Sequence, residues 1–177
     1  MADTKKSASE LGRVSVEQYA AGKRNGVVLV VDSVRSLHNV GAFFRTADAF
    51  NIEALWLCGI TATPPDREIH KTALGAELNV KWHYCKSCTE ALAQLRAQGY
   101  RLICVEQTSC AVMLDDFKVE PSQRYALVVG NEVDGVADEA VAMCDAAIEI
   151  PQSGTKHSLN VSVAAAVVLW HFYSALK

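Results

Sequence analysis

The stretch IPQSGTKHSLNVSVAAAVVLWHFY, residues 150–173, contains the end of a strand, a polar loop and a long apolar helix. Ser158 is expected to cap this helix, because its hydroxyl can accept from a backbone N–H that the first turn leaves free. The loop at 152–157 would then face the positive end of the helix dipole. An electron-rich ligand fits such a loop, and an ordinary capped core helix is the alternative.

The composition indicates one ordinary folded domain. Half of the 177 residues are apolar and 21% are charged, which excludes a disordered chain. The apolar helix at 161–176 is shorter than the ~20 residues that a bilayer requires, so no membrane partner is expected. Residues 1–10 are polar and lack the apolar segment of a secretory signal, which predicts a cytoplasmic protein.

The charged residues are distributed unevenly. A net charge of −3 argues against a uniformly basic surface for nucleic acid. The predicted loops and helix starts nevertheless contain enough cations for a local basic surface, and the N-terminal segment is basic as well. The cations are Arg35, Arg45, Arg67, Lys71 and Lys156 in the first group, and Lys5, Lys6, Arg13, Lys23 and Arg24 in the second.

The six cysteines indicate free thiols rather than a metal centre. Four of them lie in or beside apolar, strand-like runs, where a free thiol behaves as a small apolar side chain. Cys85 and Cys88 form a C-x-x-C pair, but no second pair stands at the spacing of a zinc site. No metal is therefore expected, and zinc or redox chemistry at this pair is the less favoured alternative.

Strand-like and helix-like segments alternate along the chain. The run VVLVVD at 27–32 has the length and β-branching of a strand that is buried on both faces. This alternation predicts an α/β domain with a mostly parallel sheet of about six strands flanked by helices. The predicted strands are 27–32, 54–58, 80–84, 100–106, 125–129 and 146–150, with helices at 40–50, 66–74 and 89–98. Residues 1–25 are predicted to form a short basic extension with a weak helix at 16–21, and residues 26–177 to form the domain.

Three polar, glycine-containing loops follow predicted strands of this sheet. In open parallel sheets, ligands bind outside the carboxyl ends of the strands. The loops at 33–41, 130–135 and 152–160 are therefore expected to converge on one site. The second loop matches neither the dinucleotide fingerprint nor the phosphate loop, so a tight turn is predicted there.

Asn39 stands in the first loop, just before the helix predicted from about Val40, and Arg45 lies a little over one turn into that helix, with Gly41 allowing close backbone approach. The guanidinium of Arg45 offers a planar fork of donors for a phosphate or an oxyanion. A surface arginine on an amphipathic helix is the equal alternative. Glu132 in the second loop can serve as an acid, a base or a partner of Arg45, although a carboxylate in a turn is more often solvated.

Three motifs together resemble those of a known family. HNVGAFFRTADAF (38–50), LVVGNEVDGV (127–136) and IPQSGTKHSLNVSVAAAVV (150–168) are similar, in order and spacing, to the three motifs of the SpoU (TrmH-type) branch of the SPOUT RNA methyltransferases. The joint occurrence of three motifs is more specific than any single one. The resemblance covers roughly residues 27–177.

The resemblance implies a SPOUT fold with a deep C-terminal trefoil knot. Such knots are very rare in other protein folds. It also implies an S-adenosylmethionine site in the knot, a homodimer, and 2′-O-methylation of ribose in tRNA or rRNA. Catalytic roles are implied for Asn39, Arg45, Glu132, Ser158 and Asn160. Cofactor contacts are implied for Gly130, Asn131, Ile150, Pro151, Ser158, Leu159 and Asn160.

An arginine in the first motif is expected to act electrostatically. Because a guanidinium with a pKa above ~12 hardly ever releases its proton, Arg45 is interpreted as a phosphate clamp that stabilises the developing alkoxide. The identity of the group that deprotonates the 2′-hydroxyl is left open.

Two other functions stay open at this point. One is a non-catalytic RNA-binding or assembly protein that retains the knotted fold. The acidic net charge favours it, as do the roughly 25 residues that stand where the family often has an RNA-binding domain. The other is an α/β enzyme for a small phosphorylated metabolite, which the helix N-terminus alone suggests. No DNA partner is expected.

Overall fold

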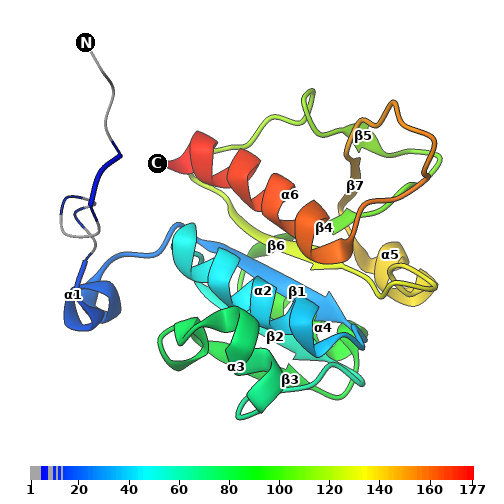
Figure 1. Ribbon diagram of the computed structural model, residues 1–177. Helices are drawn as coiled ribbons and strands as arrows, with labels where there is room; N and C mark the ends of the chain where they lie inside the picture. The colour runs from blue at the N-terminus through cyan, green and yellow to red at the C-terminus, as the bar shows by residue number, and fades with distance from the viewer. Residues whose placement is uncertain (1–4, 8–9, 11, 13) are drawn as a thin grey trace.

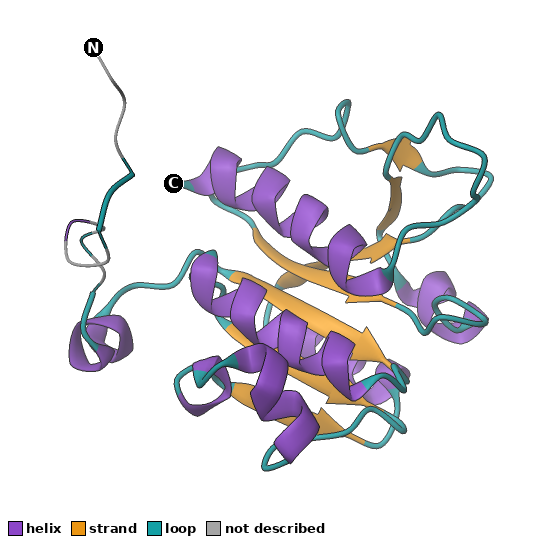
Figure 2. Ribbon diagram, viewed as in Figure 1, coloured by secondary structure: helices purple, strands orange, loops and turns teal. Residues whose placement is uncertain are grey.

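One parallel sheet with helices on both faces forms the body of the molecule (Figures 1 and 2). The computed structural model describes residues 5–7, 10, 12 and 14–177. The strand order is β3-β2-β1-β6-β4-β7-β5, and every pairing between these strands is parallel. The strands are β1 (Val27–Asp32), β2 (Ala54–Cys58), β3 (Trp82–Cys85), β4 (Tyr100–Val105), β5 (Val112–Met113), β6 (Arg124–Val129) and β7 (Ala146–Glu149).

Helices α2 and α6 lie side by side on the near face of the sheet, and α4 lies behind it (Figure 1). The weak helix predicted at 16–21 is confirmed, and Ser15 caps it. The helices are α1 (Val16–Ala21), α2 (Leu37–Ala49), α3 (Arg67–Ala73), the 3₁₀ helix η2 (Ala76–Leu78), α4 (Cys88–Ala97), α5 (Asp138–Met143) and α6 (Val161–Leu176).

The predicted α/β architecture is confirmed, with one strand more than the six expected. The additional strand, β5, has two exposed residues, and among the described strands it pairs with β7 alone, at the edge of the sheet. Two residues are too short for a hydrophobic pattern to reveal a strand. The predicted trefoil knot stays a prediction.

Strand β1 lies in the middle of the sheet and is buried along its whole length. Its side chains alternate between two apolar layers, as the two-residue repeat of a strand requires. Val27, Leu29 and Val31 pack in the layer that contains α2 and α6 residues such as Phe43. Val28 and Val30 pack in the layer that contains residues of α4 and α5. The unbroken apolar run of β1 therefore reflects burial on both faces.

Gly41 allows helices α2 and α3 to cross at close range. A Cβ atom at this position would lie 2.0 Å from Thr72 Oγ1 and 2.3 Å from the carbonyl oxygen of Ile69. The close approach predicted from the sequence is therefore real, but the neighbour of Gly41 is helix α3.

The prediction that Ser158 caps the last helix is wrong, because Asn160 is the N-cap of α6. Its Oδ1 accepts from the backbone N–H groups of Ser162 at 2.9 Å and of Val163 at 3.4 Å. Asparagine and serine are comparable N-caps, so residue preference alone does not distinguish the two positions. The loop before α6 is consequently two residues longer than predicted.

Most of the N-terminal segment 1–10 and Arg13 lie outside the described residues, so the expectations about them are untested. Within the ranges that the structure describes, no helix has the length and apolar character needed to span a membrane.

The C-x-x-C pair lies in the apolar layer that contains α4, with Cys85 at the end of β3 and Cys88 as the first residue of α4. Cys85 and Cys88 are buried and free, and Cys85 pairs in register with Cys58 on the neighbouring strand. Burial raises the pKa of the Cys85 thiol. The hydrogen bond with the Cys58 thiol, and then burial, raise the pKa of Cys88. Both thiols are therefore protonated near neutral pH, and the described residues include no group of three or more side chains that could hold a metal.

One fast-reacting thiol per chain is expected in the native protein. Cys110 is the exposed cysteine, whereas the pKa of half-buried Cys144 is raised by its hydrogen bond with Cys104 and by burial. Thiolates, not thiols, react with disulfide reagents. Titration with a disulfide reagent at pH 8 should show one thiol per chain that reacts rapidly, and Cys110→Ser should remove it. The other five thiols should react only after the protein is unfolded. Two or more rapid equivalents would contradict the burial of the C-x-x-C pair.

Candidate functional site

A pocket of about 550 Å³ lies at the carboxyl ends of β4, β6 and β7. Its walls come from the end of β4, from the loop after β6, and from the segment that joins β7 to α6. This is the edge of a parallel sheet where ligands are expected to bind. The lining residues are 105–107, 129–135, 148–150, Gln152, 158–161 and Ala164.

A chain of hydrogen bonds joins the three predicted loops at this pocket. Asn39, in the first turn of α2, donates from Nδ2 to Oε1 of Glu132 at 2.7 Å. Asn160, the N-cap of α6, donates from Nδ2 to Oδ1 of Asn39 at 3.2 Å. The partners are separated by 93 and 121 residues in the sequence. The predicted convergence of the three loops is therefore confirmed.

Most of the predicted site residues line this pocket. Asn39 is 8% exposed and reaches the pocket through its bonds to Glu132 and Asn160. Pro151 is exposed and is not a lining residue. The residues that line the pocket as predicted are Gly130, Asn131, Glu132, Ile150, Ser158, Leu159 and Asn160.

Arg45 lies outside the pocket of its own chain. It is exposed on α2 and is not a lining residue. Six residues at about 100° each place its side chain about 240° around the helix from Asn39. The alternative in which Glu132 pairs with Arg45 is not realised, because Glu132 accepts from Asn39 instead.

The walls of the pocket are acidic. None of the lining residues is lysine or arginine, whereas four of them carry carboxylates. A low-dielectric cleft lined by one sign of charge attracts ligands of the opposite sign. The pocket therefore favours a ligand with a positive charge. The carboxylates are Glu106, Glu132, Asp134 and Glu149.

The second loop is a compact turn, as the sequence predicts. The backbone groups of Asn131 and Gly135 exchange hydrogen bonds at 3.0 and 3.1 Å, and Oδ1 of Asn131 accepts from the N–H groups of Val133 and Asp134. A Cβ atom at Gly130 would lie 1.9 Å from the carbonyl carbon of Gly135. Only glycine fits at position 130 while the turn keeps this shape.

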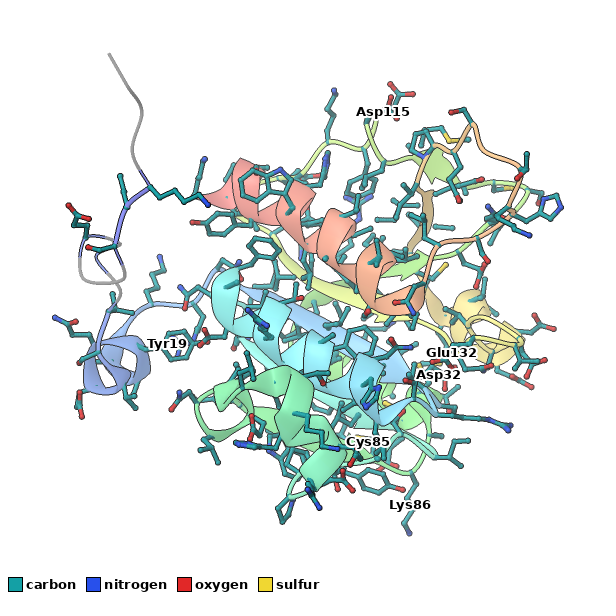
Figure 3. The ribbon with its side chains drawn as sticks, in the orientation of Figure 1. Tyr19, Asp32, Cys85, Lys86, Asp115 and Glu132 are labelled. Carbon is teal, nitrogen blue, oxygen red and sulfur yellow. The ribbon has the colours of Figure 1, made fainter. Side chains whose placement is uncertain are left out.

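Sequence reasoning missed two carboxylates that hold the end of the second loop. Oε2 of Glu106 accepts from the N–H of Val136 at 3.0 Å, and Oδ2 of Asp32 accepts from the N–H of Ala137 at 3.1 Å. Asp32 and Glu132 are both labelled near the end of β1 in Figure 3. An acidic residue at the carboxyl end of a buried strand was the available signal, because that edge carries the ligand site.

Comparison with known proteins agrees with this arrangement. The sequence model described as the SpoU rRNA Methylase family matches residues 26–170. The chain is 29% identical over 165 residues to the 23S rRNA (guanosine-2′-O-)-methyltransferase RlmB of Vibrio vulnificus, with 93% of this chain and 66% of that protein covered. It is 31% identical over 166 residues to the tRNA (guanosine(18)-2′-O)-methyltransferase of Thermus thermophilus, with 92% and 81% covered.

Solved structures share the fold. The AdoMet-bound rRNA methyltransferase from Sinorhizobium meliloti superposes with a TM-score of 0.80 at 26% identity, covering 88% of this chain and 58% of that one. The A. aeolicus TrmH/SpoU tRNA modifying enzyme has a TM-score of 0.80 at 24% identity, covering 90% and 80%, and shows likeness of fold alone. The chain spans slightly less than two thirds of the Vibrio vulnificus relative.

Proposed function

Because this chain belongs to the SpoU rRNA Methylase family, we propose that it transfers a methyl group from S-adenosylmethionine to a ribose 2′-hydroxyl of tRNA or rRNA. Residues 26–177 are the methyltransferase domain in this proposal, and residues 1–25 are an extension. The observation that carries the proposal is the hydrogen-bonded convergence of Glu132, Asn39 and Asn160 beside one pocket. Similar proteins that are 2′-O-methyltransferases of tRNA or 23S rRNA support it.

The residues of the pocket fit S-adenosylmethionine. Its acidic wall suits the positive charge of a sulfonium, and Gly130 lets the backbone of the second loop approach a ligand closely. When bound, the cofactor supplies an activated methyl group. Gly130, Ile150 and Leu159 would hold it largely through backbone groups, together with Asn131, Ser158 and Asn160. Pro151 is the first residue after Ile150 and does not line the pocket.

The side chains at the rim orient the acceptor. Glu132 is held by Asn39, and Asn39 is held by Asn160, so these three side chains keep fixed positions relative to one another. A ribose hydroxyl is a weak nucleophile, and alignment with the methyl group supplies much of the rate enhancement. Arg45 stabilises the phosphate and the developing alkoxide, and no metal takes part.

The chain functions as a homodimer that forms through α6. Val163, Val167 and Trp170 recur at helical spacing and are 49%, 37% and 52% exposed, and Leu159 continues this apolar stripe to the pocket. Exposed apolar stripes of this kind mark protein interfaces. Figure 1 shows α6 on the near surface, beside α2. Dimerisation would cover the stripe and bring α2 of one copy towards the other.

Val167→Asp should convert the dimer into a monomer and abolish methyl transfer. A carboxylate that is buried without a partner costs several kcal/mol, about enough to dissociate a micromolar dimer. Light scattering after gel filtration measures the mass. Val14→Asp, at an exposed valine outside α6, is the matched control and should remain dimeric. A Val167→Asp protein of unchanged mass would show that the interface lies elsewhere.

The proposed activity is tested with labelled S-adenosylmethionine and total RNA from a strain that lacks the gene. Label should enter RNA at linkages that resist alkali, because methylation removes the 2′-hydroxyl that attacks the phosphate. Binding of the cofactor without transfer would favour the non-catalytic RNA-binding or assembly protein. Absence of cofactor binding would overturn the proposal. A cytoplasmic location and the absence of DNA as a partner stay predictions.

A further inference from the structure

Among the described residues, a single side chain outside the 151–159 loop between β7 and α6 makes a hydrogen bond to that loop. Residues 151–159 are all exposed. Within the described part of the chain, one hydrogen bond joins this segment to other residues, and in it Nε2 of Gln107 donates to the carbonyl oxygen of His157 at 3.0 Å. The next two residues, Ser158 and Leu159, line the pocket. Gln107 therefore holds the residue that directly precedes this wall, and Asn160 follows the wall.

Gln107 is well placed to hold the loop because its own backbone is anchored. It follows β4, which pairs with β6 and β7 inside the sheet. The carboxylate of Glu106 accepts from the N–H of Gln107 at 2.9 Å and from the N–H of Val136 at 3.0 Å. One dipeptide at the end of β4 thus contacts both loops that enclose the pocket.

We propose that Gln107 is a positioning residue that keeps the 151–159 loop docked, so that Ser158 and Leu159 stay in the wall of the cofactor site. A hydrogen bond of ordinary net strength changes the ratio of docked to undocked loop by about three- to tenfold. A ligand that contacts this wall binds only the docked form, so its apparent affinity falls with the docked fraction. Only the identity of that ligand rests on the proposed function.

Limited trypsin digestion tests the docking without any ligand. Lys156 precedes His157 in the loop, and mass spectrometry distinguishes cleavage after it from cleavage elsewhere. Gln107→Ala should accelerate this cleavage about three- to tenfold. Gln107→Glu should do the same, because it keeps the size of the side chain and replaces the donor by an acceptor. Gln123→Ala is the matched control, since its amide donates to the carbonyl oxygens of Gly99 and Arg124, and it should leave the rate unchanged.

Calorimetry and kinetics then separate positioning from catalysis. In a loop that is mostly docked, loss of the bond raises the undocked fraction about three- to tenfold and lowers the docked fraction by a smaller factor. For Gln107→Ala, the Kd and KM for S-adenosylmethionine should therefore rise by a smaller factor than the cleavage accelerates, while kcat at saturating cofactor stays within about twofold. Unchanged cleavage after Lys156, or equal acceleration in Gln123→Ala, would overturn the role of Gln107. A wild-type protein that binds no S-adenosylmethionine would overturn the proposed function instead, and the digestion would still decide the role of Gln107.

Discussion

Arg45→Ala should lower the rate of methyl transfer at least about 100-fold, the usual effect of removing a group that stabilises an oxyanion. The Kd for S-adenosylmethionine should stay within about twofold, because Arg45 is not among the residues that line the pocket. Single-turnover kinetics measure the first quantity and calorimetry the second. Arg45→Lys keeps the charge but loses the planar fork, so its rate should be intermediate. Equal losses in binding and transfer would mean that the role of Arg45 is misassigned.

The position of Arg45 outside the pocket bears on which copy of the chain supplies the cation. The wall of the pocket contains no lysine or arginine, so the cation that stabilises the acceptor comes from outside that wall. In the proposed homodimer, the partner subunit's Arg45 would supply it. Each active site would then combine Asn160 of one copy with an arginine of the other.

Mixing two inactive variants tests such a shared site. In a dimer of one Arg45→Ala copy and one Asn160→Ala copy, a shared site leaves one of the two active sites intact. Random mixing makes half of the dimers mixed, so about a quarter of the wild-type activity should return. If each site belongs to a single chain, every site keeps one defect and no activity returns.

Gly130→Ala should cost about 1–3 kcal/mol of stability and weaken S-adenosylmethionine binding at least about tenfold. Its Cβ would lie 1.9 Å from the carbonyl carbon of Gly135 and 2.1 Å from the nitrogen of Val136. These are backbone atoms that Asn131 and Glu106 hold in place, so the loop must move. Urea unfolding measures the stability and calorimetry the affinity.

Gly154→Ala is the matched control for this variant. A Cβ atom at Gly154 meets nothing within 4 Å, and this glycine lies in the loop before α6. The free energy of unfolding of the Gly154→Ala variant and its affinity for S-adenosylmethionine should therefore stay near those of the wild type. A Gly130→Ala protein with unchanged affinity would show that the second loop does not form the cofactor site.

Much of the fold could be predicted because its signals are local. The unbroken apolar runs of β1 and β6 indicate strands that are buried on both faces. The alternation of strands and helices along the chain then predicts a parallel α/β sheet. Strand β5 escaped prediction, because it is defined by its pairing with β7, in which Val112 and Met113 lie opposite Ile148 and Glu149.

The candidate site could be predicted as three loops but not as contacts. The sequence by itself determined which loops follow strands, and parallel strands place those loops at one edge of the sheet. Only the tertiary structure decided that Asn160 caps α6 and that Gly41 contacts α3. It also decided that Arg45 does not line the pocket of its own chain and that Gln107 holds the loop at His157. The physical reason is that periodicity and residue preference act over a few neighbouring residues. The hydrogen bonds that build the site instead join residues 50, 93 and 121 positions apart.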